Sequence, residues 1–511
     1  MKPQLITVDA RGAGQGKTTD TTNGIYSRIT KLTLNNDRVF IVNPSKDLQS
    51  QYQADLAKRS IAVTVINSGD ENNKKPAIRE QLDEILPKKP AVISVTDQGF
   101  NHNVIDYASK QHYHLIIDEC IKPMVHQVIV SKYQPLSTMR WDLAFSVCNE
   151  ELLSAYCELE LTADAKNDRD CQGIDFVNYR IFVLKEEYKI FMETAMKQDA
   201  ALNYIAVLRP DRLEGWKSIH IAAAAFGYTF TAVWLKLFGL KYTVIKDFEP
   251  HRGRSDKKIV IHYSEINITK DQYVKNKKLV KALQDYASSI ANNGEYISLY
   301  NKGVIKEADD IAIDHIKYGH KIKHNAHGIN QFQHINTCLV LSRLKLSDHL
   351  RNFIDAVSPG TSGIVTEAYT HYQFIMRSSL RNSSAGDCHI IIPSGISAKH
   401  IMEEFCVIDE NLDAVSINDL VNSQFIKKEQ VVDKVDILAE LSKLPKTFID
   451  IPGCNGKYQL HPDLILRKIT KKGNTDTDHS KKFANNKLVN YGAKGTIRIK
   501  ALIKLTFGIG D

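Results

Sequence analysis

The sequence predicts an α/β protein built on parallel sheets and arranged as two successive series. Short apolar runs alternate with longer stretches of helical character from Leu5 to about Pro393. Strands that alternate with helices are typical of a parallel sheet. A glycine-rich turn follows the first apolar run, and a pair of carboxylates follows a later one. The charged break Arg252–Asp256 separates the two series, and the length of 511 residues fits about two to four domains.

The glycine-rich turn Arg11–Thr19 reads RGAGQGKTT and follows an apolar run that ends at Val8. We expect the turn to lead directly into a helix that continues to about Leu32. Such a turn cradles phosphate, because exposed N–H groups and the positive end of the helix point at the anion. In this pattern Lys17 reaches the outer phosphates and the Thr18 hydroxyl holds Mg²⁺; an ordinary glycine turn is the alternative. The expected nucleotide-binding residues are Gly14, Gln15, Gly16, Lys17, Thr18 and Thr19.

Two carboxylates, Asp118 and Glu119, follow the apolar run Leu115–Ile117. The run predicts a buried parallel strand, and ligands bind at the carboxyl ends of such strands. We expect Asp118 to hold, through water, a Mg²⁺ ion that bridges the terminal phosphates. Glu119 is then placed to polarise the attacking water. A surface pair of acidic residues is the alternative, but a buried strand does not usually precede one.

A GxGKT loop and a DExx box about one hundred residues apart resemble the motor of superfamily 1 and superfamily 2 helicases, superfamily 2 above all. Arg11 stands where the strict loop pattern has glycine, and Asp118–Ile121 reads DECI, a variant of the DEAD and DEAH boxes. The resemblance implies two tandem RecA-like motor domains with ATP and Mg²⁺ in the cleft between them.

Two strand ends resemble the motifs with which helicases contact nucleic acid. The run Arg38–Val42 ends in a Pro-Ser turn, where backbone amides and the Ser45 hydroxyl would take a DNA phosphate. The run Ala91–Thr96 ends in a threonine that either contacts the strand or caps the following helix.

Two segments fit the third helicase motif, a strand that ends in Ser/Thr-Ala-Thr. Leu161–Asp164 has the letters, and Ile219–Thr229 has the context of a small-residue strand before a helix. Thr162 and Thr229 both stay open as the motif threonine, with Thr229 favoured. The second choice makes residues 121–217 an insertion, whose mixed polar and apolar sequence predicts an ordered subdomain.

The second series begins with a predicted strand at Lys258–Tyr263. A long amphipathic helix at Asp271–Ala291 and a strand at Glu295–Tyr300 follow. The segment His324–Asn330 resembles helicase motif V, whose glycine lets the backbone approach DNA, and it precedes a predicted strand at Thr337–Leu341.

The segment Tyr372–Arg381 resembles helicase motif VI. Gln373, Arg377 and Arg381 are each four residues apart, which predicts one face of one helix. The resemblance implies that one arginine acts as the finger on the γ-phosphate, and Arg377 is favoured over Arg381. A helix with charges on its exposed face is the alternative. The expected catalytic residues are Glu119, Gln373, Arg377 and Arg381. The run Cys388–Pro393 is expected to close the sheet.

Charge is unevenly distributed in a chain whose net charge is +8. Residues Lys457–Asp511 contain 12 Lys+Arg against 4 Asp+Glu, so the rest of the chain is close to neutral. A basic tract on a neutral motor fits an acidic polymer as partner; a solubilising tail is the alternative. Aromatic residues within this tract suit base stacking as well as a small core, namely Tyr458, Phe483, Tyr491 and Phe507.

The eight cysteines are scattered without a CxxC pair, so neither a zinc ribbon nor a disulfide framework is indicated. No targeting segment precedes the first apolar run. The longest uncharged apolar run, Ile221–Leu235, has 15 residues and is too short to span a bilayer. We therefore expect a cytoplasmic protein without membrane contact.

The expected division of the chain is a first motor domain at residues 1–250, with an insertion at about 121–217, and a second motor domain at residues 251–407. A small basic accessory region at residues 408–511 completes it. The expected function is an ATP-dependent helicase that translocates on DNA, as a single strand or a duplex fork, and unwinds it. Replication proteins are further expected partners, and the compact size is typical of a phage- or plasmid-encoded helicase.

Two alternatives stay open. One is a DNA-dependent ATPase that remodels protein–DNA complexes without unwinding. The other is a non-motor nucleotide-binding protein, which has no reason to carry a second α/β series ending in Gln373, Arg377 and Arg381. A position of that segment far from the glycine loop would favour the non-motor alternative.

Truncation after residue 455 should weaken nucleic-acid binding and flatten its salt dependence, because the basic tract would no longer release counterions. The slope of log K against log salt should become shallower by about 0.7 to 0.9 for each phosphate contact that is lost. Fluorescence anisotropy titrations at several salt concentrations measure this slope. An unchanged slope would exclude the tract as the phosphate-binding element.

Overall fold

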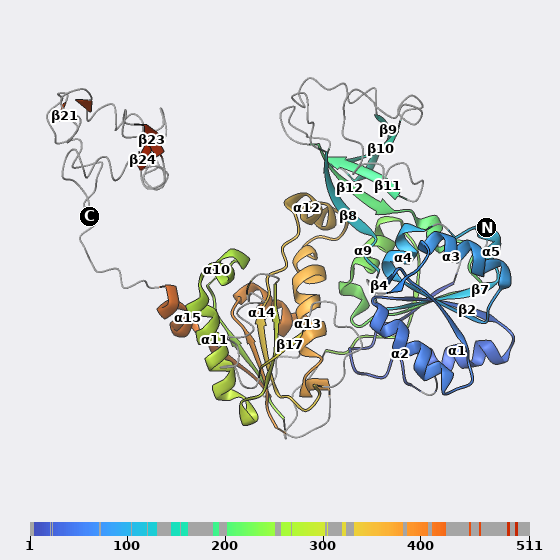
Figure 1. Ribbon diagram of the computed structural model, residues 1–511, viewed down its shortest axis with the longest axis horizontal. Helices are drawn as coiled ribbons and strands as arrows, with labels where there is room; N and C mark the ends of the chain where they lie inside the picture. Colours follow the sequence, from blue (N-terminus) through green and yellow to red (C-terminus); the bar gives the residue numbers. More distant parts are fainter. Residues whose placement is uncertain are drawn as a thin grey trace. The chain divides into compact units, whose positions relative to one another are not determined.

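The protein is described by a computed structural model of its 511 residues (Figure 1). It divides into two compact units, residues 1–424 and 425–511, which we describe separately. The structure describes residues 5–20, 22, 24–70, 73–103, 105–119, 121–129, 145–153, 155–161, 188–193, 202–250, 257–266, 268–301, 304, 319–322, 332–381, 386–406, 411–425, 449–450, 459–460, 488–490 and 496–498.

The first domain, residues 5–250, is organised by a parallel sheet of seven described strands in the order β14-β1-β13-β7-β2-β6-β3. All of its strand pairs are parallel. The strands are β1 (Ile6–Asp9), β2 (Arg38–Asn43), β3 (Val63–Ile66), β6 (Val92–Thr96), β7 (Tyr113–Asp118), β13 (Ile219–Ala222) and β14 (Thr243–Lys246). The strand before the glycine loop, β1, and the strand before the carboxylate pair, β7, are both hydrogen-bonded to β13.

Helices cover both faces of this sheet. The side chains of β2 alternate between the two faces and pack into a core on each. Val39 and Ile41 pack with α1 and α2 on one face, whereas Phe40 and Val42 belong to the core under α3, α4 and α9. The helices are α1 (Ile25–Leu34), α2 (Lys46–Ala57), α3 (Ile78–Ile85), α4 (Asp97–His102), α5 (Tyr107–Lys110) and α9 (Phe230–Leu237), with the 3₁₀ turns η1 (Leu86–Lys88), η4 (Pro210–Leu213) and η5 (Phe226–Tyr228) and the small hairpin β4 (Gly69–Asp70) and β5 (Asn73–Lys74).

The helix predicted to begin directly after the glycine loop begins later, at Ile25. The chain makes one tight turn after Gly16 and then folds back, so that the Ile25 N–H donates to the Lys17 carbonyl at 2.9 Å. Gly24 makes this return possible, because a Cβ there would lie 2.6 Å from the backbone of Asp20. The prediction was wrong on this point because it ignored a contact between backbone segments.

Of the two candidates for the third motif, the described strands include one. Ile219–Ala222 forms β13, which lies between β1 and β7. The other candidate begins at the end of β10, and its residues 162–164 lie outside the described part of the chain. The favoured candidate therefore lies inside the sheet, next to the strand that carries the carboxylate pair.

Between β7 and β13 the chain forms an insert, an antiparallel sheet in the order β8-β12-β11-β10-β9. Its strands are β8 (Met124–Ile129), β9 (Phe145–Leu153), β10 (Tyr156–Leu161), β11 (Tyr188–Glu193) and β12 (Leu202–Leu208). An ordered subdomain was predicted at this place, and the described strands confirm it.

The second domain, residues 257–424, is organised by a sheet in the order β17-β16-β18-β19-β15-β20, with parallel pairing throughout the described strands. The strands are β15 (Ile259–Tyr263), β16 (Tyr296–Tyr300), β17 (Gly319–Ile322), β18 (Thr337–Leu341), β19 (Cys388–Ile392) and β20 (Leu412–Ser416). The described strands confirm the predicted fold class of two tandem parallel α/β sheets with an inserted subdomain.

The helices of the second domain are α10 (Lys270–Lys275), α11 (Lys277–Ile290), α12 (Asp348–Val357), α13 (Tyr369–Ile375), α14 (Gly395–His400) and α15 (Asn418–Phe425), with the 3₁₀ turns η6 (Asn292–Gly294) and η10 (Ser379–Arg381) and the π-helical turns η9 (Ile364–Ala368) and η11 (Ile401–Phe405). The helix predicted at Asp271–Ala291 is split at Asn276, whose side chain caps α11 by accepting from the Leu279 N–H at 3.1 Å.

Two boundaries in the second domain differ from the prediction. The sheet does not end at residue 407, because β20 pairs with β15 along its whole length. The helix predicted through Gln373 and Arg381 ends at Ile375. The Ser378 hydroxyl donates to the Ile375 carbonyl at 2.7 Å, and the Ser379 N–H donates to the Ile335 carbonyl.

One helix of the second domain, α12, packs on the insert of the first (Figure 1). Phe353 lies edge-on to Tyr156 with ring centroids 5.1 Å apart and also contacts Phe191 at 5.2 Å. Its neighbours on the same face, Leu350 and Ile354, belong to the same core cluster. The insert is thereby joined to both domains.

In the second unit, the described residues form two short antiparallel hairpins. These are β21 (Ile449–Asp450) with β22 (Gln459–Leu460), and β23 (Leu488–Asn490) with β24 (Thr496–Arg498). Within the described part of the whole chain, no helix has both the length and the apolar character needed to cross a bilayer.

Replacing Phe353 with alanine should detach α12 from the insert. The ring is fully buried, and truncation of such a phenylalanine costs about 3–5 kcal/mol. Urea denaturation should show the loss, and hydrogen exchange should rise in α12 and β11. The exposed neighbour Asn352 is the matched control; equal effects of Phe353→Ala and Asn352→Ala would contradict this packing account.

Candidate functional site

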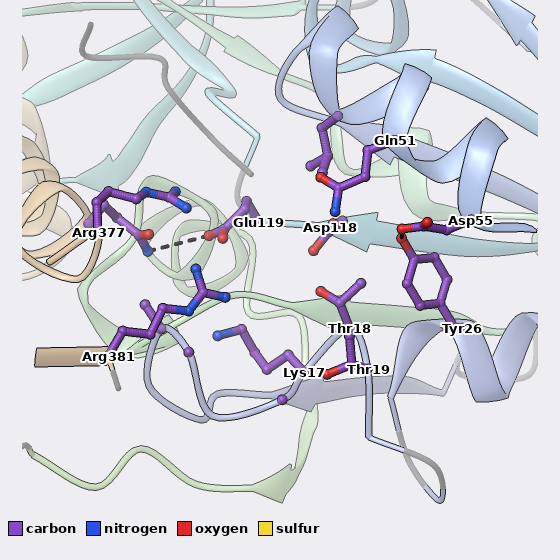
Figure 2. A pocket seen from close by; sticks show the side chains of 15 residues that line it. Lys17, Thr18, Thr19, Tyr26, Gln51, Asp55, Asp118, Glu119, Arg377 and Arg381 are labelled. Atoms are coloured by element: carbon purple, nitrogen blue, oxygen red, sulfur yellow. Dashed lines mark hydrogen bonds between the residues drawn. The ribbon is translucent and has the colours of Figure 1, made fainter. Parts of the chain in front are cut away.

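One pocket gathers most of the residues that the sequence singled out, and it is lined from both domains (Figure 2). The first domain contributes the glycine loop, the carboxylate pair and one face of α2. The second domain contributes Gln373 of α13 and two arginines from the segment that follows this helix. The lining residues are Ala13, Gly14, Gly16, Lys17, Thr18, Thr19, Tyr26, Leu48, Gln51, Asp55, Asp118, Glu119, Gln373, Arg377 and Arg381.

The glycine loop holds its lysine by its own backbone. Lys17 Nζ donates to the carbonyls of Arg11 at 2.9 Å and Gly12 at 3.0 Å. Gly14 and Gly16 have φ angles of +83° and +80°, a region where glycine is the favoured residue. Burial lowers the pKa of Lys17, while Glu119 and Asp118 raise it. The lysine is thus a buried cation beside carboxylates and backbone oxygens.

Arg11, which replaces the first glycine of the strict pattern, ties the start of the loop to its end. Its guanidinium donates to both carboxylate oxygens of Asp9, at 2.9 and 2.6 Å, and to Asp20 Oδ2 at 2.8 Å. Asp9 is fully buried at the end of β1. These hydrogen bonds, that with Asp9 above all, raise the pKa of Arg11. Such a fork is specific to arginine, and it fixes the loop without a glycine at position 11.

The second domain lies directly on the loop backbone. The Tyr372 hydroxyl accepts the Ala13 N–H at 2.9 Å. A Cβ at Gly14 would come within 2.3 Å of Arg381 Cγ, and one at Gly12 within 3.0 Å of the Tyr372 hydroxyl. The second domain therefore leaves no room for a side chain at Gly14 and little room for one at Gly12.

The carboxylate pair is held at the end of β7 by contacts on both sides. Glu119 has a φ of +68°, a strained conformation for a residue with a side chain, and its N–H donates to the Ala222 carbonyl of β13 at 2.9 Å. Gln373 Nε2 donates to Glu119 Oε2 at 3.4 Å. Tyr52 donates its hydroxyl to Asp118 Oδ2 at 2.8 Å.

Electrostatics favour an anion in this pocket. Lys17, Arg377 and Arg381 surround the two carboxylates, and burial lowers the pKa of each of these three cations. Burial, together with the Glu119 charge, raises the pKa of Asp118 to about 7. A bound polyanion would compensate the buried cations, since charges in such surroundings need partners.

The oxygen atoms at the loop suit a magnesium ion. Thr18 and Asp118 line the same pocket, and Figure 2 shows the threonine beneath the carboxylate. Mg²⁺ is bound through one or two carboxylates together with substrate phosphates. The Thr18 hydroxyl and the Asp118 carboxylate beside the glycine loop supply oxygen donors of this kind, so these residues fit the ion.

Most predicted site residues meet here, with a few exceptions. Gln15 is predicted to bind nucleotide, but its side chain turns back to accept the Gly12 N–H at 2.7 Å and does not line the pocket. Ser45 and Thr96 accept the N–H groups of Leu48 at 3.2 Å and of Gly99 at 3.1 Å, so both cap helices. The segment His324–Asn330, which resembles motif V, lies outside the described part of the chain.

Several residues of the site escaped sequence reasoning. Leu48, Gln51, Tyr52 and Asp55 share one face of α2 at helical spacing. Their mixed polarity at this spacing is the sequence signal that could have identified them. Tyr372 stands directly before Gln373, but its contact with the loop spans two domains and leaves no local signal.

No protein-family model matches the chain, and comparison with curated proteins finds no match. Among solved structures the chain is similar to one titled XPD_APO, with a TM-score of 0.42 and 11% identity over 81% of this chain and 97% of that chain. It is similar to Xpd4 of S. tokodaii, with a TM-score of 0.41 and 10% identity over 80% and 96%. S. cerevisiae Dbp5 bound to RNA and ADP BeF3 follows, with a TM-score of 0.37 and 12% identity over 83% and 88%.

Replacing Arg11 with alanine should destabilise the first domain by about 3–5 kcal/mol, because it leaves the buried Asp9 carboxylate without its ion-pair partner. Urea denaturation measures this change. Arg11→Lys should recover only part of it, since lysine cannot form the fork. Arg79, in an exposed pair with Asp83, is the matched control. A loss in Arg11→Ala no larger than in Arg79→Ala would refute the role of Arg11.

Proposed function

We propose that the protein is an ATP-dependent nucleic-acid motor, a helicase that acts on DNA. A single observation carries the proposal: one pocket joins a phosphate loop and a carboxylate pair from one domain to a glutamine and two arginines from the other. In a motor this arrangement lets the state of a nucleotide set the distance between the two domains.

Each side chain has a role in this proposal. The loop N–H groups and Lys17 bind the phosphates, and Thr18 with Asp118 holds Mg²⁺. With the ion bound, these two residues would hold positive charge beside the phosphates. Glu119 accepts the proton of the attacking water, and its hydrogen bond with Gln373 orients it.

The arginines come from the opposite domain. Arg377 is 7% exposed, and Arg381 lies over Gly14. An arginine that enters from a second domain stabilises charge on the transferred phosphoryl group. Because it leaves when that domain moves away, hydrolysis would depend on cleft closure, and loss of phosphate would favour opening.

DNA is the proposed track. The basic tract Lys457–Asp511 supplies positive charge for phosphates. Alternate closing and opening of the cleft would shift the grip on one strand, so that the motor steps along it. An ATPase that remodels protein–DNA complexes without unwinding has the same site, and a strand-displacement assay distinguishes the two.

The non-motor alternative is disfavoured by the position of Arg381. A position of the Gln373–Arg381 segment far from the loop would have favoured it, whereas Arg381 lies within contact of Gly14. A protein that only binds a nucleotide needs no such contribution from a second domain.

ATP turnover should rise with single-stranded DNA in the wild type and fall by about 10²–10⁴-fold in Glu119→Gln, because the general base is lost. Lys17→Ala should abolish turnover and leave DNA binding nearly intact, since Lys17 contacts the pocket and not the track. Steady-state assays and DNA anisotropy titrations measure both effects.

Glu84→Gln, an exposed carboxylate on α3, is the control and should behave as the wild type. An ATP turnover rate that does not change when DNA is added would favour an RNA or protein substrate over DNA. Loss of DNA binding in Lys17→Ala, or full turnover in Glu119→Gln, would contradict the roles given above.

A further inference from the structure

A buried tyrosine, Tyr52, is hydrogen-bonded to Asp118, the first of the two carboxylates. Tyr52 lies on α2, has no exposed surface, and donates its hydroxyl to Asp118 Oδ2 at 2.8 Å. The strand before α2, β2, is the direct neighbour of β7, with Val42 opposite Ile117. This pairing brings the first turns of α2 beside the end of β7, where Asp118 stands.

Packing, and not the hydrogen bond alone, fixes the tyrosine ring. Tyr26 contacts it edge-on with ring centroids 5.2 Å apart, and Ile25 and Leu56 belong to the same core cluster. The hydroxyl therefore has a set position, to which the carboxylate must adjust. A buried phenol needs a hydrogen-bond partner, and Asp118 is the partner that the structure gives it.

This contact gives the two oxygens of the Asp118 carboxylate different surroundings. Oδ2 is engaged by Tyr52, which restricts rotation of the carboxylate about its Cβ–Cγ bond. Asp118 also lines the pocket, above Thr18 (Figure 2). Oδ1 is thus the oxygen that can be directed to an ion held with the Thr18 hydroxyl.

The neighbouring tyrosine does something different. Tyr26 donates its hydroxyl to Asp55 Oδ2 at 2.9 Å. Two tyrosines from adjacent helices thus contact separate carboxylates, and Tyr52 is the one that is bonded to the carboxylate of the DE pair.

We propose that Tyr52 is a positioning residue for magnesium: it orients the Asp118 carboxylate so that one oxygen faces the ion bound with the nucleotide. The inference rests on the proposed function and names a residue that supports that site. Partners in this outer position change metal affinity or activity by about 10–100-fold when they are removed.

The test compares Tyr52→Phe with the wild type in binding Mn²⁺, a spectroscopic substitute for Mg²⁺. Electron paramagnetic resonance titrations, with a saturating non-hydrolysable ATP analogue, give the Mn²⁺ affinity without turnover. A fluorescent ATP analogue in EDTA gives the metal-free nucleotide affinity. We expect Tyr52→Phe to bind Mn²⁺ about 10–100-fold more weakly and to keep the metal-free nucleotide affinity.

Tyr113→Phe is the matched control, because Tyr113 is a buried tyrosine at the opposite end of β7. Equal Mn²⁺ affinity in Tyr52→Phe and Tyr113→Phe would overturn the inference. An equal loss of metal-free nucleotide affinity in Tyr52→Phe would overturn it too, since the role would then be structural. Absence of nucleotide binding by the wild type would overturn the proposed function and this inference together.

Discussion

The approach of the second domain to the glycine loop is the constraint on which the site depends. Arg381 lies where a side chain at Gly14 would have to be, and the Tyr372 hydroxyl takes the Ala13 N–H. A side chain at position 14 would collide with Arg381, so Gly14 allows this contact. The same contact brings Gln373 within hydrogen-bonding distance of Glu119. The pocket therefore forms only where both domains meet.

Two features of the site, the strained backbone at Glu119 and the buried charge of Asp9, are stabilised by contacts with neighbouring residues. The left-handed conformation of Glu119 costs about 1–3 kcal/mol, and the β13 backbone stabilises it through the Ala222 carbonyl. Arg11 binds the buried Asp9 and thereby replaces a glycine with an ion pair. Such preorganisation places donors and acceptors before a ligand arrives, which is the main source of electrostatic stabilisation in enzymes.

Sequence reasoning reached what is local and missed what depends on distant contacts. Apolar runs and the spacing of the loop and the DE pair indicated the first sheet correctly. The end of α13 at Ile375 was missed because the Ser379 N–H bonds to a residue far away in sequence. The strand β20 was missed because most of its residues are exposed and form no apolar run. Tyr52 was missed because its partner lies 66 residues away, and the expected phage or plasmid origin stays a prediction.

The most direct test of the central claim is an experimental structure with Mg²⁺ and a non-hydrolysable ATP analogue. We expect the γ-phosphate to lie between Lys17 and Arg377, with the ion between Thr18 and Asp118. A nucleotide bound to the loop with Arg377 and Arg381 turned away from it would contradict a shared site. A nucleotide bound elsewhere would contradict the assignment of the loop itself.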